Sequence, residues 1–124
     1  TPINKKISAA NVFNYIPTFV ATNSSEALTN TSTAVSVSTA ISTVDSSGGT
    51  VTVTLAAGVT GQLKTIICTT AGNNITVTPA ATVGSGTTVV LDAAGESVQL
   101  LYTGTAWAAV ATSSFATNIA TVIQ

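Results

Sequence analysis

Hydrophobic and polar side chains alternate with a period of two along much of the chain beyond about residue 32. Val35 and Val37 alternate with serines, and residues 50–55 alternate threonine with Val or Leu. Successive side chains of a β-strand point to opposite faces, so this alternation predicts strands with one buried face. Residues 45–49 are rich in turn formers and lie between the two runs, which we interpret as a β-hairpin.

Four or five further strands follow, separated by turns rich in Gly, Asn and Asp. The predicted strands are 62–69, 75–78, 87–91, 97–102 and 106–111. Val98, Leu100 and Tyr102 fall on one strand face, and Trp107 is the expected core anchor of the last strand. Short strands at regular spacing predict an all-β domain, a single antiparallel β-sandwich or barrel-like meander of about six to eight strands.

The two ends of the chain lack the two-residue period. We interpret residues 1–31 as an N-terminal arm, 32–112 as the β domain and 113–124 as a C-terminal tail. In the arm, a helix starting at 8–11 would end at Pro17, so we expect one helical turn at most.

The tail carries its apolar residues on a roughly helical spacing. These residues are Phe115, Ile119, Val122 and Ile123. The segment is too short and too rich in threonine for a stable lone helix. An extended strand that pairs with a neighbour is the other interpretation.

The charge content restricts the partners of the chain. Only 6% of the residues are charged, and the chain has no His, Arg or Met. Binding to duplex nucleic acid needs several basic side chains, and only Lys5, Lys6 and Lys64 are present, so no nucleic-acid partner is expected. The uncharged run 65–91 contains Asn, Pro and Gly and is too polar for a membrane-spanning helix. So few charges give little self-repulsion, which favours a permanent neighbour.

Few residues are candidates for catalysis. Cys68 is the single cysteine and lies in an apolar run, so we expect a small buried hydrophobe; no His is present to act as its base. Asp92 and Glu96 flank one turn and are the only local pair of acids. The favoured interpretation is that Asp92 caps the turn through its own backbone while Glu96 is solvated.

Metal ions and cofactors are not expected either. A zinc site would need several Cys or His ligands, and the chain has one Cys and no His. A calcium site would need several carboxylates. The glycines of 84–86 lack the lysine of a phosphate-binding loop. We therefore expect no catalytic, cofactor-binding or metal-binding residue, and no enzyme activity.

Two terminal and surface signals are weak. Asn23, Asn30 and Asn74 begin Asn-x-Ser/Thr sequences that arise by chance in such a composition, and the start of the chain lacks the apolar region of a signal peptide. Lys5 and Lys6 belong either to a solvated arm or to an arm that contacts an acidic patch on a partner.

One part of the chain resembles a known group of proteins. The segments are GQLKTII at 61–67, GNNITVTP at 72–79, TTVVL at 87–91, AGESVQLLY at 94–102 and GTAW at 104–107. They resemble a theme in small virion proteins of tailed bacteriophages, notably marine and cyanobacterial phages. There, G-x-x-K-T-I, I-T-V-T-P, G-x-S-V-x-L and G-x-x-W recur in capsid decoration (cement) proteins and in tail or fibre domains. The resemblance covers about residues 61–110 and brings no active-site residues.

The resemblance implies a structural protein of the virion. The expected role is a capsid decoration (cement) protein that stabilises a phage head through arm and sheet contacts, with the major capsid protein as partner. Threefold docking positions, common on phage heads, imply a homotrimer. The alternative is a tail-fibre or spike module that binds a host receptor or glycan, although Tyr102 and Trp107 are both expected in the core. A glycan-active enzyme is disfavoured because paired carboxylates are not evident.

Overall fold

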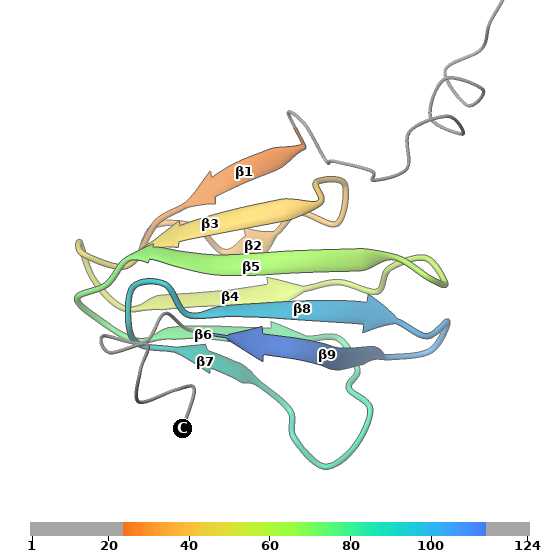
Figure 1. The fold of residues 1–124 in the computed structure, drawn as a ribbon. Coiled ribbons are helices and arrows are strands. Elements are labelled where there is room, and N and C mark those ends of the chain that lie inside the picture. The colour runs from red at the N-terminus through yellow and green to blue at the C-terminus, as the bar shows by residue number, and fades with distance from the viewer. Residues whose placement is uncertain (1–23, 114–124) are drawn as a thin grey trace, which may run out of the picture.

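The computed structural model describes residues 24–113, which form nine β-strands and no helix (Figure 1). The strands are β1 (Ser25–Leu28), β2 (Ala34–Val35), β3 (Ile41–Asp45), β4 (Val51–Leu55), β5 (Leu63–Thr70), β6 (Ile75–Pro79), β7 (Val89–Leu91), β8 (Ser97–Tyr102) and β9 (Trp107–Ser113). They build a five-stranded sheet, β1-β3-β5-β8-β9, and a four-stranded sheet, β2-β4-β6-β7. The prediction of an all-β chain is confirmed, and the sheets do not close into a barrel.

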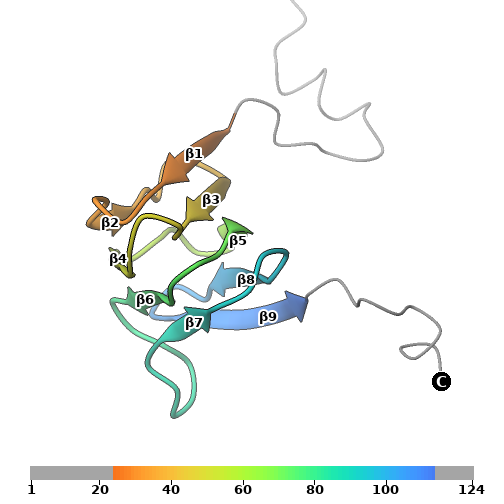
Figure 2. The ribbon, with the colours of Figure 1, turned by 90° about the vertical axis from the view of Figure 1, so that its left-hand side faces the viewer.

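The first six strands alternate between the two sheets, so the chain winds as a flattened coil (Figures 1 and 2). β1, β3 and β5 lie parallel in one sheet, and β2, β4 and β6 lie parallel in the other. Ile41 pairs with Thr65 and Val51 with Ile75, so successive turns of the coil are stacked in register. Each turn therefore covers the apolar surface of the turn before it.

The predicted antiparallel topology is wrong for these six strands, and the predicted hairpin around 45–49 is wrong. β3 and β4 flank residues 46–50 but lie in different sheets, so these residues form an arch that crosses the sandwich. One-faced alternation is the same in parallel and antiparallel strands, and an arch uses the same turn-forming residues as a hairpin. Only β6–β7, β5–β8 and β8–β9 pair antiparallel, at the C-terminal end of the described chain.

The core lies between the two sheets and follows the predicted alternation. In β4 the buried residues are Val51, Val53 and Leu55, while both threonines between them are exposed. In β8 the buried residues are Val98, Leu100 and Tyr102, as predicted. Cys68 is also fully buried, in the middle of β5. Alternate apolar positions thus supply nearly all of the core.

Trp107 anchors one end of the sandwich. Its side chain is 1% exposed, its Nε1 donates to the carbonyl oxygen of Ala56 at 2.9 Å, and its ring meets Tyr102 edge to face with centroids 5.1 Å apart. A Cβ at Gly58 would lie 2.8 Å from the ring, so only glycine lets this loop pass so close. The prediction of a core tryptophan is confirmed, with Tyr102 as its aromatic partner.

Part of the sequence interpretation lies outside the described residues. The predicted helical turn near 8–11, Pro17, Lys5 and Lys6 fall within residues 1–23, and nearly all of the tail falls within 114–124. Strand β1 lies inside the range 1–31 that the sequence pattern assigned to the arm.

We expect Trp107→Ala to lower the free energy of unfolding by about 3–5 kcal/mol, because it removes a buried ring and leaves a cavity. Trp107→Phe should cost less, because it keeps a buried aromatic ring and loses mainly the hydrogen bond to Ala56. Val59→Ala is the control, because Val59 is 73% exposed. Urea denaturation followed by circular dichroism measures all three variants. A cost for Trp107→Ala no larger than that of the control would contradict the role of Trp107 as an anchor.

Candidate functional site

A charged side chain lies inside the sandwich. Lys64 of β5 is fully buried because it points into the core on the same face as Ile66. Its Nζ donates to the carbonyl oxygen and to Oγ1 of Thr39, both at 2.8 Å, and lies 3.7 Å from Oε2 of Glu26. A buried ammonium group without such partners would be strongly destabilising.

Glu26 of β1 completes this polar network. Its Oε2 accepts hydrogen bonds from the backbone N–H of Ser36 at 2.7 Å and from the hydroxyl of Ser42 at 2.5 Å. The parallel pairing of β1 with β3 places Glu26 directly beside Ser42. The Glu26 side chain is 22% exposed, so the network extends from the interior to the surface beside β1.

The contacts of this network fit a structural role better than a catalytic one. Burial lowers the pKa of Lys64, and the nearby Glu26 carboxylate acts in the opposite direction by favouring the ammonium form. A lysine with a lowered pKa can serve as a base or a nucleophile where a substrate reaches it. Here Nζ is enclosed, donates two hydrogen bonds to Thr39 and forms an ion pair with Glu26. The network therefore ties edge strand β1 and the 36–39 loop to β5.

The turn between β7 and β8 differs from the prediction. Glu96, not Asp92, caps it: Oε1 of Glu96 accepts the backbone N–H groups of Asp92 at 2.6 Å and Ala93 at 2.9 Å. These hydrogen bonds favour the carboxylate and hold the pKa of Glu96 below its ordinary value. Glu96 lies four positions after Asp92, and its longer side chain reaches back across the turn. The local acid pair is thus used in the turn rather than presented for acid–base catalysis.

The remaining predicted candidates do not form a site in the described part of the chain. Burial, and after it the negative charges of Glu96, Asp45 and Asp92, raise the pKa of the Cys68 thiol, which disfavours the reactive thiolate. Within residues 24–113, no three acidic or cysteine side chains come together as metal ligands. No helix in that range is long and apolar enough to cross a membrane.

Aromatic side chains for sugar stacking are also not presented. Both Tyr102 and Trp107 are buried, as predicted. All other aromatic residues of the chain lie outside the described ranges. The described surface therefore offers a glycan no aromatic platform.

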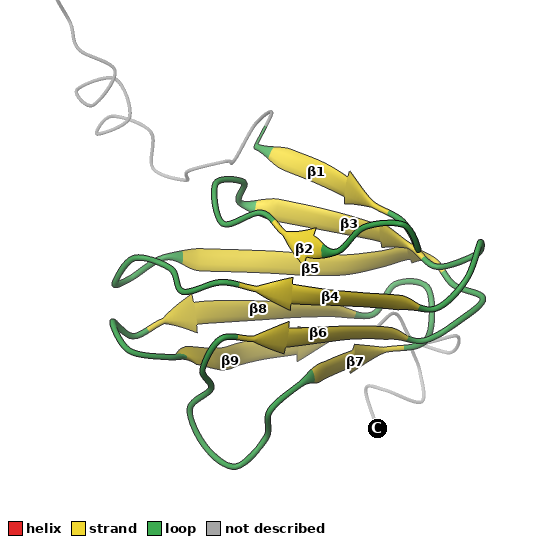
Figure 3. Cartoon of the chain, turned by 180° about the vertical axis from the view of Figure 1, so that it is seen from behind, coloured by secondary structure: helices red, strands yellow, loops and turns green. Residues whose placement is uncertain are grey.

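The most distinctive surface feature is the set of unpaired strand edges. β1 and β2 end the sheets on one side of the sandwich, and β7 and β9 end them on the other (Figure 3). None of these four strands contains Lys or Pro, the residues that commonly protect an edge from further pairing. Glu26, the only charged residue in them, is held by the network described above. Apart from Trp107 of β9, which forms a β-bridge with Thr82, these outer edges pair with no described strand.

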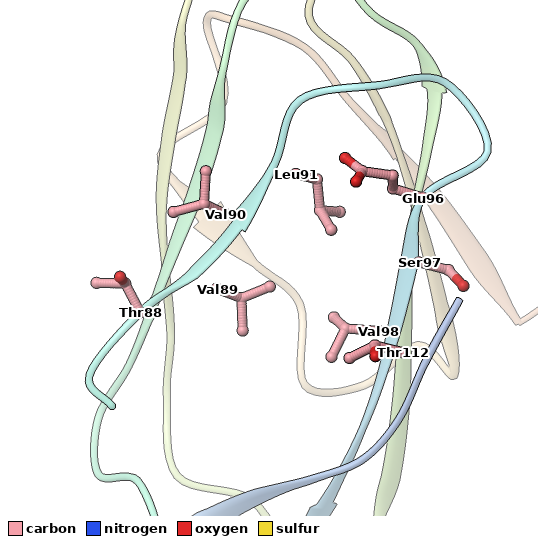
Figure 4. Close-up of a pocket in the computed structure, with 8 residues that line it drawn as sticks. All are labelled: Thr88, Val89, Val90, Leu91, Glu96, Ser97, Val98 and Thr112. Atoms are coloured by element: carbon pink, nitrogen blue, oxygen red, sulfur yellow. The ribbon is translucent and has the colours of Figure 1, made fainter. Parts of the chain in front are cut away.

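A groove lies between the open edges of β7 and β9 (Figure 4). It has a volume of about 370 Å³, and its walls include Val89 and Leu91 of β7, Val98 of β8 and Thr112 of β9, with Glu96 at one end. Sequence reasoning missed this groove. It arises where a five-stranded sheet faces a four-stranded one, and no local pattern reports how many strands each sheet will contain.

Comparison with known proteins adds no family to this description. No protein-family model matches the chain, and a search of curated proteins gives no significant match. The resemblance to phage virion proteins therefore stays a prediction.

The Lys64–Glu26 pair predicts a measurable coupling. Glu26→Ala leaves the Lys64 ammonium buried without its counter-charge and should cost about 3–5 kcal/mol, toward the lower value because Glu26 is partly exposed. Lys64→Met keeps the apolar stem and removes the buried charge, so it should be milder. The double variant should be more stable than Glu26→Ala alone. Strictly additive free energies of unfolding in urea titrations would show that the two side chains do not interact.

The capped turn predicts a pH dependence below neutrality. The folded-state pKa of Glu96 is lowered, so its stabilising contribution is complete above the ordinary pKa of 4.5 and is lost as the pH falls through the folded value. Wild type should therefore lose thermal stability below about pH 4.5 more steeply than Glu96→Gln. Hydrogen bonds from Ser47 lower the pKa of Asp45 as well. Adding Asp45→Asn to Glu96→Gln should therefore reduce the dependence of the melting temperature on pH further. Melting temperatures between pH 3 and pH 6 that run parallel in all variants would refute this.

Proposed function

We propose that the chain is a structural protein of a phage virion, a capsid decoration (cement) protein that binds the head through strand edges and its N-terminal arm. The observation that carries the proposal is that the edge strands on the arm side of the sandwich, β1 and β2, contain no Lys or Pro. A freely diffusing β protein usually blocks such edges. Leaving them open suits a protein whose edges pair with permanent neighbours.

The outer surface of the strands supports the same function. The exposed positions of β4 are threonines, and the exposed apolar residues of the strands include Leu63, Val90 and Val110. Such a surface offers methyl contacts and hydroxyl hydrogen bonds with little charge repulsion between copies. Self-association follows from this surface, and the trimeric number rests on the phage resemblance alone.

The position of the arm agrees with a docking role. Residues 1–23 join the described chain next to β1, an open edge of the five-stranded sheet. An arm attached at this point could bind the same shell protein that pairs with the β1 edge. The major capsid protein is the proposed partner.

A tail-fibre or spike module is the second candidate, and the coil of the first six strands favours it. Coils of stacked strands extend along their axis by adding further turns, and the β1 and β2 edges are where a preceding turn would stack. A fibre built this way would present its host-binding surface on other parts of the protein.

We also propose that the chain has no catalytic activity. Among the described residues, Lys64 is enclosed, Cys68 is buried, and the carboxylate of Glu96 accepts hydrogen bonds within a turn. Buried groups that already have partners are unsuited to bind and transform a substrate.

The proposed function is tested on virions of the phage that encodes the chain. We expect cryo-EM of purified particles to place the β domain on the head surface at symmetric positions. Particles whose chain lacks residues 1–20 should lose this density, while the isolated variant keeps the circular dichroism of a folded β protein. Density on a tail fibre would contradict the decoration role and favour the second candidate. Particles that lack the chain altogether would contradict both.

A further inference from the structure

Strand β9 has no strand opposite it. Ala109 and Thr112 pair with Leu100 and Val98 of β8, so they share the inward face with these two residues. Leu100 and Val98 are buried, whereas Ala109 and Thr112 are exposed. Inward-facing positions of a sandwich are normally covered by the second sheet. The four-stranded sheet therefore lacks a strand next to β7, where a fifth would cover β9.

The groove has the shape of a site for one extended strand. In Figure 4 the side chain of Val89 projects toward Val98 and Thr112 across the gap. The capped turn at Glu96 bounds one end, and at the other end Trp107 exchanges backbone hydrogen bonds with Ala81 and Val83. The edge of β7 beside this space pairs with no described strand. An incoming strand would meet the apolar side chains of Val89, Leu91 and Val98 together with polar groups of the groove and the unpaired backbone edge of β7.

The path of the chain leads to this site. The chain crosses from the five-stranded to the four-stranded sheet after β1 through residues 29–33, after β3 through residues 46–50 and after β5 through residues 71–74. β9 ends at the same end of the sandwich, because Ser97 at the start of β8 pairs with both Ile67 of β5 and Ser113 of β9. A fourth crossing from Ser113 would enter the four-stranded sheet next to β7 and run antiparallel to it.

We propose that residues 114–124 of the same chain make this fourth crossing and occupy the groove as a fifth strand beside β7. An arch of four or five residues, like the three before it, leaves six or seven of the eleven residues, and β6 has five. The segment has no charged side chain, and Ile119 and Ile123 fall on one face of a strand. Because the segment is attached at the mouth of the groove, its effective concentration there is about millimolar. This favours it over the same segment of another molecule.

The proposal does not depend on the role in a virion, because it concerns how one molecule completes its own sheet. The main test is deletion of residues 114–124, with amide hydrogen exchange measured on the full chain and on the deleted variant. Exchange at β7 should become about tenfold faster or more without the segment, while β4 and β6 stay protected. A synthetic peptide of residues 114–124, added at millimolar concentration, should restore the protection.

Two substitutions make the test independent of the deletion. Val89→Lys places a charge in the groove and should speed exchange at β7 in the full chain. Val59→Lys is the matched control, since Val59 is 73% exposed and lies in the loop between β4 and β5 rather than in the groove lining, and it should leave exchange at β7 unchanged. Unchanged exchange at β7 after both the deletion and Val89→Lys would overturn the proposal.

The same experiment distinguishes the other occupants of the groove. Protection of β7 that is independent of protein concentration, in a monomer by light scattering, supports occupation by the chain's own segment. Protection that falls on dilution together with dissociation of a dimer would show a segment of a second copy there, and would overturn the proposal. Protection that appears only when another protein is added would overturn it equally.

Discussion

Most of the described strands bury one face that is mainly apolar, and the rest of the structure depends on covering that face. A lone sheet of such strands would leave its apolar face exposed to water, so the chain needs a second sheet opposite the first. The winding of β1 to β6 meets this need at once, because each passage across the sandwich lays a strand over the one just formed. Val44, Ile66 and Cys68 on one side and Val51, Val53 and Ile75 on the other thereby become one core.

The same winding explains where charge is tolerated inside. β1 is short and has a neighbour on one side only, so apolar contact alone holds it weakly. Glu26 accepts a hydrogen bond from Ser42 of β3 and forms an ion pair with Lys64 of β5, which also donates to Thr39, so these polar contacts link β1 to its neighbours. Such networks contribute to stability only when every member is bonded, and among the described residues no buried side-chain nitrogen or oxygen lacks a partner.

The ends of the sandwich are less complete than its middle, and this shapes the proposed functions. A coil of stacked strands needs a cap at each end, or a neighbour in place of one. At the β1 and β2 side the edges are open, while at the other side β7, β8 and β9 turn back antiparallel and leave the groove. The proposed assembly through the β1 and β2 edges and the proposed fifth strand beside β7 therefore concern opposite sides of the sandwich.

The sequence by itself determined which residues are buried and where the chain turns. Alternation placed Val51, Val53 and Leu55, then Val98, Leu100 and Tyr102, in the core, and the size of Trp107 marked it as an anchor. These properties are local, since they follow from the two-residue period of a strand. The choice between arch and hairpin at 46–50 was made by the tertiary structure, because the same turn residues serve both. The burial of Lys64 beside Glu26 and the exposed inner face of Ala109 and Thr112 likewise depend on which strands become neighbours, and pairing between segments distant in the sequence leaves no mark on either segment alone.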